Sequence, residues 1–382
     1  MNRLIISGLA LSEPGTMGGN SKITLEIARH ASATSEVHLF LPRYKLPTVT
    51  DNVPAAPGLV LHPLADFAGC DKFRPLTSSH HYQRLLAAEF AALGAGPGDV
   101  VFGCSDFHLD VLPMAALQRR FRFKWLPSVF LFVPGVGDNL RQGYGFPVAK
   151  YALYRVYQRR LLNTMLRGAS GFVITNDCDR REFPARFADR LFPFYGGVNV
   201  EQLPREPVPR TRDVVYCSRL HPQKGLLPFL DAWQRVVAAD PTRHLTVIGN
   251  GERGYESQLR ARARALGIAA SIDWLGYVNN EEKYRLYASA RLFVHPTVYD
   301  NNGMVAAEAL CSGLPVVMFD LENLRHVYDV GCTKVPCRDY AAFARAILAN
   351  PRAPAAGEVA ALREQWAWAA RVRRFLDFAS RL

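Results

Sequence analysis

Short apolar segments alternate with helical patterns along this chain, and the alternation occurs twice. Near-continuous apolar strands separated by helices are typical of parallel sheets covered on both faces. Two such sets in one chain of 382 residues predict an α/β protein with two doubly wound domains. We expect strands at 3–7, 37–41, 99–103, 125–133, 171–175, 213–217, 244–248, 271–275, 291–295 and 314–318. We expect helices at 19–32, 80–93, 110–120, 146–167, 225–238, 253–266, 280–289, 303–312 and 339–349.

A stretch at 201–210 holds three prolines and has no periodicity, so it predicts a linker between the two sets. The first domain is then expected at 1–200 and the second at 211–356. The last segment, 357–382, has a helical pattern, and we expect it to dock back on the first domain. Ligands of such folds bind beyond the carboxyl ends of the strands, so two facing domains place the site in the cleft between them.

Composition excludes several classes of protein. Hydrophobic residues make up 49% and charged residues 21%, which allows a sizeable core and argues against disorder. No run of about 18 apolar residues occurs, so no membrane-spanning helix is expected. The 7 cysteines are odd in number and form no C-x-x-C, so we expect reduced core thiols in a cytosolic protein rather than disulfides or a zinc site.

The net charge of +12 is unevenly distributed, with an excess of bases between Arg119 and Arg190. Such an excess favours an anionic partner, either a membrane surface, a phosphorylated substrate or nucleic acid. The run 119–125 interleaves bases with aromatics as single-strand binders do, or is a helix end leading into a buried strand. The helix at 146–167 sets bases beside aromatics, which suits an anionic lipid interface, or is an ordinary amphipathic helix.

Glycines and cations follow several of the expected strands. Gly18 and Gly19 precede a helix, where backbone N–H groups can approach an anion, or they form a plain tight turn. The loop matches neither G-x-G-x-x-G nor a P-loop, so neither a dinucleotide enzyme nor a P-loop ATPase is supported. Arg219 and Lys224 bracket a turn after the first strand of the second domain, a spacing that suits two neighbouring phosphates or two unrelated surface cations.

The next two strands end in loops without charged side chains before Glu252 and Glu281. Gly249 and Asn250 follow one strand and Val278 follows the other. These loops can hold a flat ring by backbone hydrogen bonds, or they are ordinary turns between strand and helix.

The segment 295–317 has the most distinctive pattern. Asp300 precedes an expected helix and Glu308 lies inside it among small and apolar residues, where a carboxylate is costly without partners such as sugar hydroxyls. Gly303 lets the helix start approach a ligand, and the free N–H groups there favour phosphate. The alternative interpretation is an N-capping Asp300 and a solvated Glu308.

In order and spacing, these signatures resemble those of family 4 glycosyltransferases of the GT-B fold, over about 170–320. The resemblance implies two Rossmann-like domains facing across a cleft, with the second binding a nucleotide-sugar donor. It implies that Arg219 and Lys224 bind the donor diphosphate, that Glu308 holds the ribose hydroxyls and that Asp300 lies near the transferred sugar. Backbone N–H groups of Asn302, Gly303 and Met304 would bind phosphate and sugar. The resemblance also implies retention of anomeric configuration, with no cofactor and no metal, and the matching loops contain no D-x-D.

Two departures from the family pattern concern the chemistry. Asp300 stands where a glutamate is usual, one methylene longer. The family's His after the strand matching 125–133 is missing, and His108 at another strand end is the candidate to replace it.

The function that we expect is hexosyl transfer from a UDP- or GDP-sugar to a hydroxyl acceptor. A lipid-linked or polysaccharide precursor at the cytoplasmic membrane face would fit, with the basic region 119–190 on the lipid surface and no nucleic acid partner. Three alternatives stay open: a nucleotide-sugar epimerase or sugar phosphorylase of the same fold, a non-enzymatic nucleotide-sugar binder, and a nucleic-acid binder.

Overall fold

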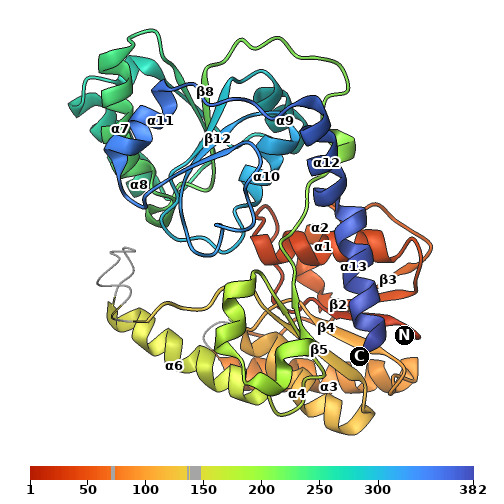
Figure 1. Cartoon of the computed structure of the whole chain (residues 1–382). Helices are drawn as coiled ribbons and strands as arrows, with labels where there is room; N and C mark the ends of the chain where they lie inside the picture. The colour runs from red at the N-terminus through yellow and green to blue at the C-terminus, as the bar shows by residue number, and fades with distance from the viewer. Residues whose placement is uncertain (70–73, 136, 138–147) are drawn as a thin grey trace. The chain divides into compact units, whose positions relative to one another are not determined.

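The computed structural model describes residues 1–382 apart from 70–73, 136 and 138–147 (Figure 1). It divides into two compact units. Unit 1 is built from described residues of 1–138, 147–196 and 368–382, and unit 2 from residues 197–367. The proline-rich stretch 201–210 therefore belongs to unit 2, because the chain leaves unit 1 after Gly196 rather than at residue 200.

Unit 1 holds a seven-stranded sheet in the order β3-β2-β1-β4-β5-β6-β7, and every neighbouring pair is parallel. Its strands are β1 (Leu4–Ser7), β2 (Val37–Pro42), β3 (Leu59–Leu64), β4 (Val100–Gly103), β5 (Lys124–Val129), β6 (Phe172–Ile174) and β7 (Leu191–Pro193). Its helices are α1 (Gly19–Ala31), α2 (Leu46–Thr50), α3 (Pro75–Leu93), α4 (His108–Phe121), α6 (Val148–Met165) and α13 (Trp368–Arg381). Helices α3, α4 and α6 pack together, and α1 packs against α13.

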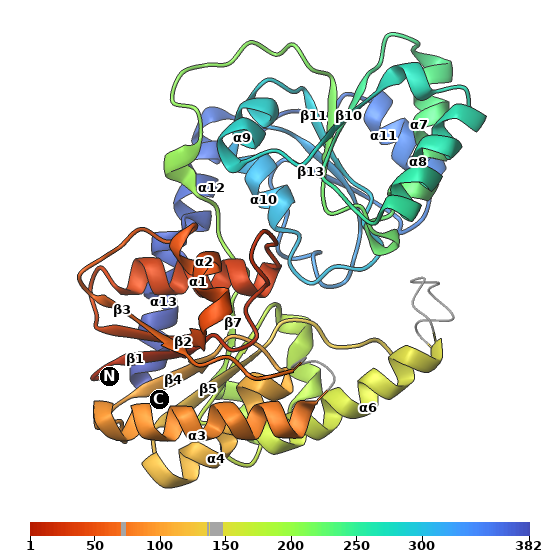
Figure 2. The ribbon, with the colours of Figure 1, turned by 180° about the vertical axis from the view of Figure 1, so that it is seen from behind.

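Unit 2 repeats this design with a six-stranded parallel sheet in the order β10-β9-β8-β11-β12-β13. Its strands are β8 (Val214–Cys217), β9 (Leu245–Ile248), β10 (Ile272–Gly276), β11 (Leu292–His295), β12 (Val316–Phe319) and β13 (Cys332–Val335). Its helices are α7 (Leu226–Ala239), α8 (Arg253–Ala265), α9 (Asn280–Ala288), α10 (Met304–Cys311), α11 (Tyr340–Leu348) and α12 (Ala356–Trp366). Helices α7, α8 and α11 lie together on one side of the sheet, and α9, α10 and α12 on the other (Figure 2).

The prediction of two doubly wound α/β domains is confirmed, and several boundaries are corrected. The segment 357–382 is not one helix: α12 stays in unit 2, and only α13 packs in unit 1. Strands β3, β7 and β13 were not predicted, and all three are sheet edges. Edge strands tolerate proline and polar residues, which interrupts the apolar pattern in β3 (LVLHPL) and β13 (CTKV).

The helix expected at 146–167 begins, in the part of the chain described, at Val148; residues 146 and 147 lie outside that part, as does Cys70. Its second half packs into the core of unit 1 through Leu162 and Met165. Its first half exposes Leu153 and Val156. In the run 119–125, Arg119 and Arg120 occupy the last turn of α4 and Trp125 is fully buried in β5.

Candidate functional site

In each sheet the chain adds strands first to one side of the first strand and then to the other, so the strand order reverses beside that first strand. Ligands of such sheets bind at this reversal, outside the carboxyl ends of the two strands that flank it. In unit 2 the reversal lies between β8 and β11. The loops that leave these two strands, 218–225 and 296–303, carry Arg219, Lys224, Asp300 and Gly303. The structure therefore brings these sequence-predicted residues to one edge of one sheet.

Glycines let these loops approach one another closely. A Cβ added to Gly225, whose φ is +71°, would lie 1.9 Å from the carbonyl oxygen of Pro296. A Cβ on Gly249 would lie 1.9 Å from the carbonyl oxygen of Ser218, and one on Gly251 would lie 2.2 Å from that of Leu220. The absence of a side chain at these three glycines thus allows the backbone of the loop after β8 to contact the backbones of the loops after β9 and β11.

A partly buried ion pair joins the first two loops. Lys224 Nζ lies 2.6 Å from Asp300 Oδ2, and the side chains are 16% and 14% exposed. Burial acts to raise the pKa of the Asp300 carboxyl, but the Lys224 ammonium, His295 and the Asn302 amide hold that pKa well below its usual range. His295 lies 3.7 Å from the same oxygen, and burial lowers its pKa to about 4, so its imidazole is neutral at pH 7.

Asp300 also shapes the start of α10. Its Oδ1 accepts the amides of Asn302 at 3.2 Å and Gly303 at 3.3 Å. Two of the three amides that the family resemblance assigned to phosphate and sugar are therefore engaged by Asp300. Met304 is the first residue of α10, so its N–H has no acceptor within the helix.

The turn at Asn302 and Gly303 is further held by Tyr328, whose hydroxyl lies 2.8 Å and 3.0 Å from the two carbonyl oxygens. Gly303 adopts a φ of +59°, and a Cβ there would lie 3.2 Å from Leu324 Cδ1. The buried side chain of Asn302 makes no hydrogen bond among the described residues, although amide groups in such places normally have a partner. A ligand with both donors and acceptors would satisfy it.

Glu308 points from α10 toward α9. Its Oε1 accepts from Lys283 Nζ at 2.8 Å, and both side chains are 13% exposed. Burial acts to lower the pKa of Lys283, but the Glu308 carboxylate raises it above its ordinary value, so the ammonium stays charged. Glu308 Oε2 is buried and has no hydrogen-bond partner among the described residues. The interpretation of Glu308 as a solvated side chain is therefore wrong, since one oxygen is paired and the other is buried and unpaired.

Arg219 differs from the cations described so far. It is exposed, and its guanidinium forms no ion pair or hydrogen bond of normal geometry within the described residues. The two cations that the sequence grouped together are therefore unequal, because Lys224 is neutralised by Asp300 and Arg219 is not.

Backbone groups of the neighbouring loops are partly occupied. The Gly249 amide donates to the Gly276 carbonyl at 2.7 Å, and the Asn250 carbonyl accepts the Leu220 amide at 2.9 Å. The Asn250 side chain is exposed and Val278 is half-buried beyond β10.

Three sequence-predicted residues belong to unit 1. The Gly18 amide donates to Ser12 Oγ at 2.9 Å, and Gly19 begins α1. His108 is the first residue of α4 and is buried, with its ring 6.3 Å from that of Tyr157.

Sequence reasoning missed Lys283, His295 and Tyr328. Lys283 stands in an otherwise ordinary helical pattern, and no local signal marks it. His295 ends a buried strand immediately before the patterned loop, which is a signal that could have been used.

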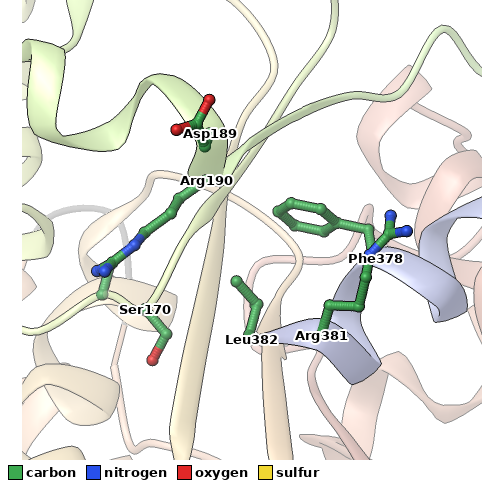
Figure 3. Close-up of a pocket in the computed structure, with 7 residues that line it drawn as sticks. Ser170, Asp189, Arg190, Phe378, Arg381 and Leu382 are labelled. Carbon is green, nitrogen blue, oxygen red and sulfur yellow. The ribbon is translucent and has the colours of Figure 1, made fainter.

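Two further features bear on what this chain could bind. Among the described residues, no cluster of three or more His, Cys, Asp or Glu side chains has an arrangement that could hold a metal ion. A hollow of about 800 Å³ in unit 1 lies between α13 and the starts of β6 and β7 (Figure 3). It is therefore at the amino ends of the strands, on the side of the sheet edge opposite to their carboxyl ends. Its lining includes Ser170, Arg190 and Phe378.

The match to a known protein family lies within unit 2. Residues 211–350 match the family described as glycosyl transferases group 1. The chain is 32% identical over 213 residues to a phosphatidyl-myo-inositol mannosyltransferase of Mycobacterium leprae, covering 51% of this chain and 55% of the relative. It is 27% identical over 233 residues to O-antigen chain mannosyltransferase B of Escherichia coli, covering 56% and 61%. The chain thus spans little more than half the length of these curated relatives.

Solved structures resemble the whole chain. Sucrose-phosphate synthase from Thermosynechococcus elongatus matches with a TM-score of 0.78 and 16% identity, over 99% of this chain and 98% of that one. Anabaena HepE, solved with UDP and glucose, matches with a TM-score of 0.71 and 16% identity over 100% of both chains. This likeness shows the fold, which is the two-domain GT-B fold expected from the sequence.

Proposed function

We propose, from the premise that residues 211–350 form a glycosyl transferases group 1 domain, that this chain transfers a hexose from a nucleoside-diphosphate donor to an acceptor hydroxyl. The observation that carries the proposal is the combination of Arg219, with no partner of its own among the described residues, and Glu308, whose Oε2 is buried and unpaired. A guanidinium suits a diphosphate, and a carboxylate oxygen suits ribose hydroxyls. Retention of anomeric configuration rests on the resemblance to family 4.

The leaving group in this reaction is a nucleoside diphosphate, and its developing charge needs donors. Arg219 supplies a planar fork, and Lys224 keeps two N–H donors beyond the one directed at Asp300. The Met304 amide at the start of α10 adds a third contribution. The bond from the anomeric carbon to the phosphate oxygen breaks as the acceptor oxygen bonds to the same face. The acceptor proton passes to the departing phosphate.

Glu308 would bind the donor ribose in this arrangement. Lys283 occupies Oε1, so Oε2 is the oxygen left to accept from the ribose hydroxyls. The ion pair also fixes the carboxylate in one orientation before the donor arrives, which lowers the entropy cost of binding.

A thermal-shift panel tests the donor assignment. UDP, GDP, ADP, CMP and their sugars are added with and without Mg²⁺, and a ligand at about 100 times its dissociation constant adds roughly 2.7 kcal/mol of stability. We expect one nucleoside diphosphate to raise the melting temperature of the wild type, and Arg219→Ala and Glu308→Ala to abolish the shift. Arg235→Ala, which removes an exposed arginine on α7, is the matched control and keeps the shift. A full shift in Arg219→Ala would overturn the assignment.

Turnover separates this proposal from its alternatives. A transferase forms a glycoside when an acceptor is present and hydrolyses donor slowly without one. A nucleotide-sugar epimerase converts the donor with no acceptor at all. A non-enzymatic binder, which the missing family His in 129–135 favours, gives the thermal shift with neither transfer nor hydrolysis. Arg219→Ala should lower kcat/KM by roughly 10²–10³-fold if it stabilises the leaving group.

A lipid-linked acceptor at an anionic membrane surface is the further part of the proposal. The first half of α6 exposes Leu153 and Val156, and the exposed Arg160 follows one turn later, so this helix can lie on a lipid surface. Not all of its bases are available, since Arg155 donates to the Val133 carbonyl and Arg159 pairs with Glu182. No described helix is long and apolar enough to span a bilayer.

Flotation with phosphatidylserine-containing vesicles tests the membrane surface. We expect binding at low salt that falls at high salt and is lost in Leu153→Glu, whereas Leu76→Glu, the same change at an equally exposed leucine of α3, retains it. Equal flotation of both variants would contradict a role for α6.

A further inference from the structure

Unit 1 has the same reversal of strand order as unit 2, here between β1 and β4. The loops that leave these two strands are tied together by one buried carboxylate, Asp110. Its Oδ1 accepts from Ser7 Oγ at 2.7 Å and from the Leu9 amide at 3.1 Å, and its Oδ2 accepts from Ser105 Oγ at 2.6 Å. Asp110 therefore links the two loops at the carboxyl end of this sheet, and both of its oxygens have hydrogen-bond donors.

Asp106 lies in the loop after β4. It is half-buried, and its Oδ2 accepts from Gln158 Nε2 of α6 at 2.7 Å. Gln158 is itself fixed, because its amide nitrogen also donates to the Leu131 carbonyl at 2.8 Å and its oxygen accepts the Val133 amide at 2.9 Å. Burial raises the pKa of Asp106 to about 6 against the opposing effect of the Gln158 hydrogen bond, so the group is a carboxylate at pH 7 without an ion-pair partner among the described residues.

Aromatic side chains of the same loop and of α6 lie near this carboxylate. Phe107 and Tyr154 are 40% and 38% exposed, with ring centroids 6.5 Å apart. Tyr154 and Tyr157 lie close enough to Asp106 for its charge to contribute, after burial, to raising the pKa of both phenols. The Tyr157 hydroxyl is buried and makes no hydrogen bond of normal geometry among the described residues. His108, by contrast, is buried against Tyr157, so its imidazole is poorly placed to reach a ligand.

We propose that Asp106, with the faces of Tyr154 and Phe107, forms the subsite of unit 1 that binds a hydroxylated ring of the acceptor. The carboxylate accepts hydrogen bonds from ring hydroxyls, while the aromatic faces cover the C–H surface of the ring, a combination of apolar walls with a few fixed polar groups that is typical of small-molecule sites. Asp106 is then an acceptor-binding residue, two positions before His108, which the sequence offered as the replacement for the family's missing His. This inference rests on the proposed function.

Saturation-transfer NMR on the full chain tests the subsite with four probes at 10 mM: the methyl glycosides of glucose, galactose and mannose, and myo-inositol. We expect at least one probe to receive saturation from the wild type, and Asp106→Asn to weaken its affinity by about 10–100-fold, the usual effect of losing hydrogen bonds to a charged group. Tyr154→Ala should also weaken it. Asp51→Asn, which changes an exposed carboxylate of the same unit, is the matched control and keeps the affinity.

The donor thermal shift is measured on the same variants. Asp106→Asn should keep the shift, because the donor contacts lie in unit 2. If the donor shift is absent even in the wild type, the proposed function fails and the sugar affinities still decide the subsite. If no probe binds the wild type, or binding survives both Asp106→Asn and Tyr154→Ala, the subsite is overturned. Circular-dichroism melting of each variant excludes unfolding as the cause of lost binding, and Asp106→Ala gives a second, independent removal of the carboxylate.

Discussion

Gly225→Ala should damage the donor loops far more than the change of one hydrogen to a methyl suggests. The left-handed φ of +71° costs a non-glycine residue about 1–2 kcal/mol. The new Cβ would also lie 1.9 Å from the Pro296 carbonyl oxygen, where ordinary contact begins at 3.4 Å, so one loop must move by more than an ångström. Overpacking of this kind adds roughly 1–3 kcal/mol. We therefore expect a total loss of about 2–5 kcal/mol.

Gly267→Ala separates the two causes. Gly267 has the same φ of +71°, but a Cβ there would meet nothing within 4 Å. It should cost only the backbone strain of about 1–2 kcal/mol. Gly254→Ala, in an exposed helical position with open space and no left-handed φ, should be neutral or stabilise by about 0.5–1 kcal/mol.

Urea unfolding followed by circular dichroism measures the three variants, and the donor thermal shift is recorded on each. Gly225→Ala should lose the shift as well as stability, because the displaced loop carries both Arg219 and Lys224. Gly267→Ala should keep the shift. Equal unfolding free energies for Gly225→Ala and Gly267→Ala, within about 0.5 kcal/mol, would refute the reasoning from loop contact.

Three other predictions concern stability. Lys224→Met leaves the partly buried Asp300 carboxylate without its cation and should cost about 1–3 kcal/mol in urea unfolding, between the values for exposed and for buried pairs. Asp300→Asn should restore part of this loss in the double variant, and a single variant as stable as the wild type would contradict a stabilising pair. The pKa of His295 is about 4 in the folded state and about 6.5 in the unfolded chain. Between these two pH values the unfolded chain binds a proton that the folded protein does not, so the free energy of unfolding should fall as pH drops from about 6.5 to about 4. The difference in unfolding free energy between wild type and His295→Gln should therefore change by up to 1.4 kcal/mol per pH unit in that window, and a constant difference would be inconsistent with a neutral buried imidazole. Phe375→Ala removes a fully buried ring of α13 and should cost about 3–5 kcal/mol in the unfolding of unit 1, while a loss below about 1 kcal/mol would mean that α13 packs loosely.

Sequence patterns predicted the central strands because those strands are buried on both faces and read as continuous apolar runs. They did not predict β7 or β13, which are four residues or shorter and lie at sheet edges. For the site, the positions of Asp300 just before α10 and of Glu308 within it predicted correctly that two carboxylates lie beside the start of one helix. The partners of these carboxylates were not predictable, since Lys224 lies 76 residues from Asp300 and Lys283 lies 25 residues from Glu308. Such pairs become neighbours only because of the order of the strands in the sheet, which local sequence does not reveal.

The carboxylate of unit 1 was missed for a related reason. Asp106 stands two residues from His108, and the family pattern directed attention to a histidine rather than to the acid beside it. The burial of Asp106 and of His108 depends on where α4 begins and on how α6 packs against α4. The local spacing of residues in the sequence does not predict either of these features.

The return of α13 to unit 1 has a consequence for biosynthesis. Trp368, Val372 and Phe375 are at most 2% exposed, so unit 1 lacks part of its core until the ribosome has passed them. About 170 residues of unit 2 are made in between, which takes roughly 10–30 s at usual elongation rates. The described part of unit 2 is contiguous in sequence and can fold as soon as it emerges, whereas the earlier-made strands of unit 1 wait with an incomplete apolar surface. We therefore expect unit 1 to expose apolar surface for longer than unit 2 while the chain is being made.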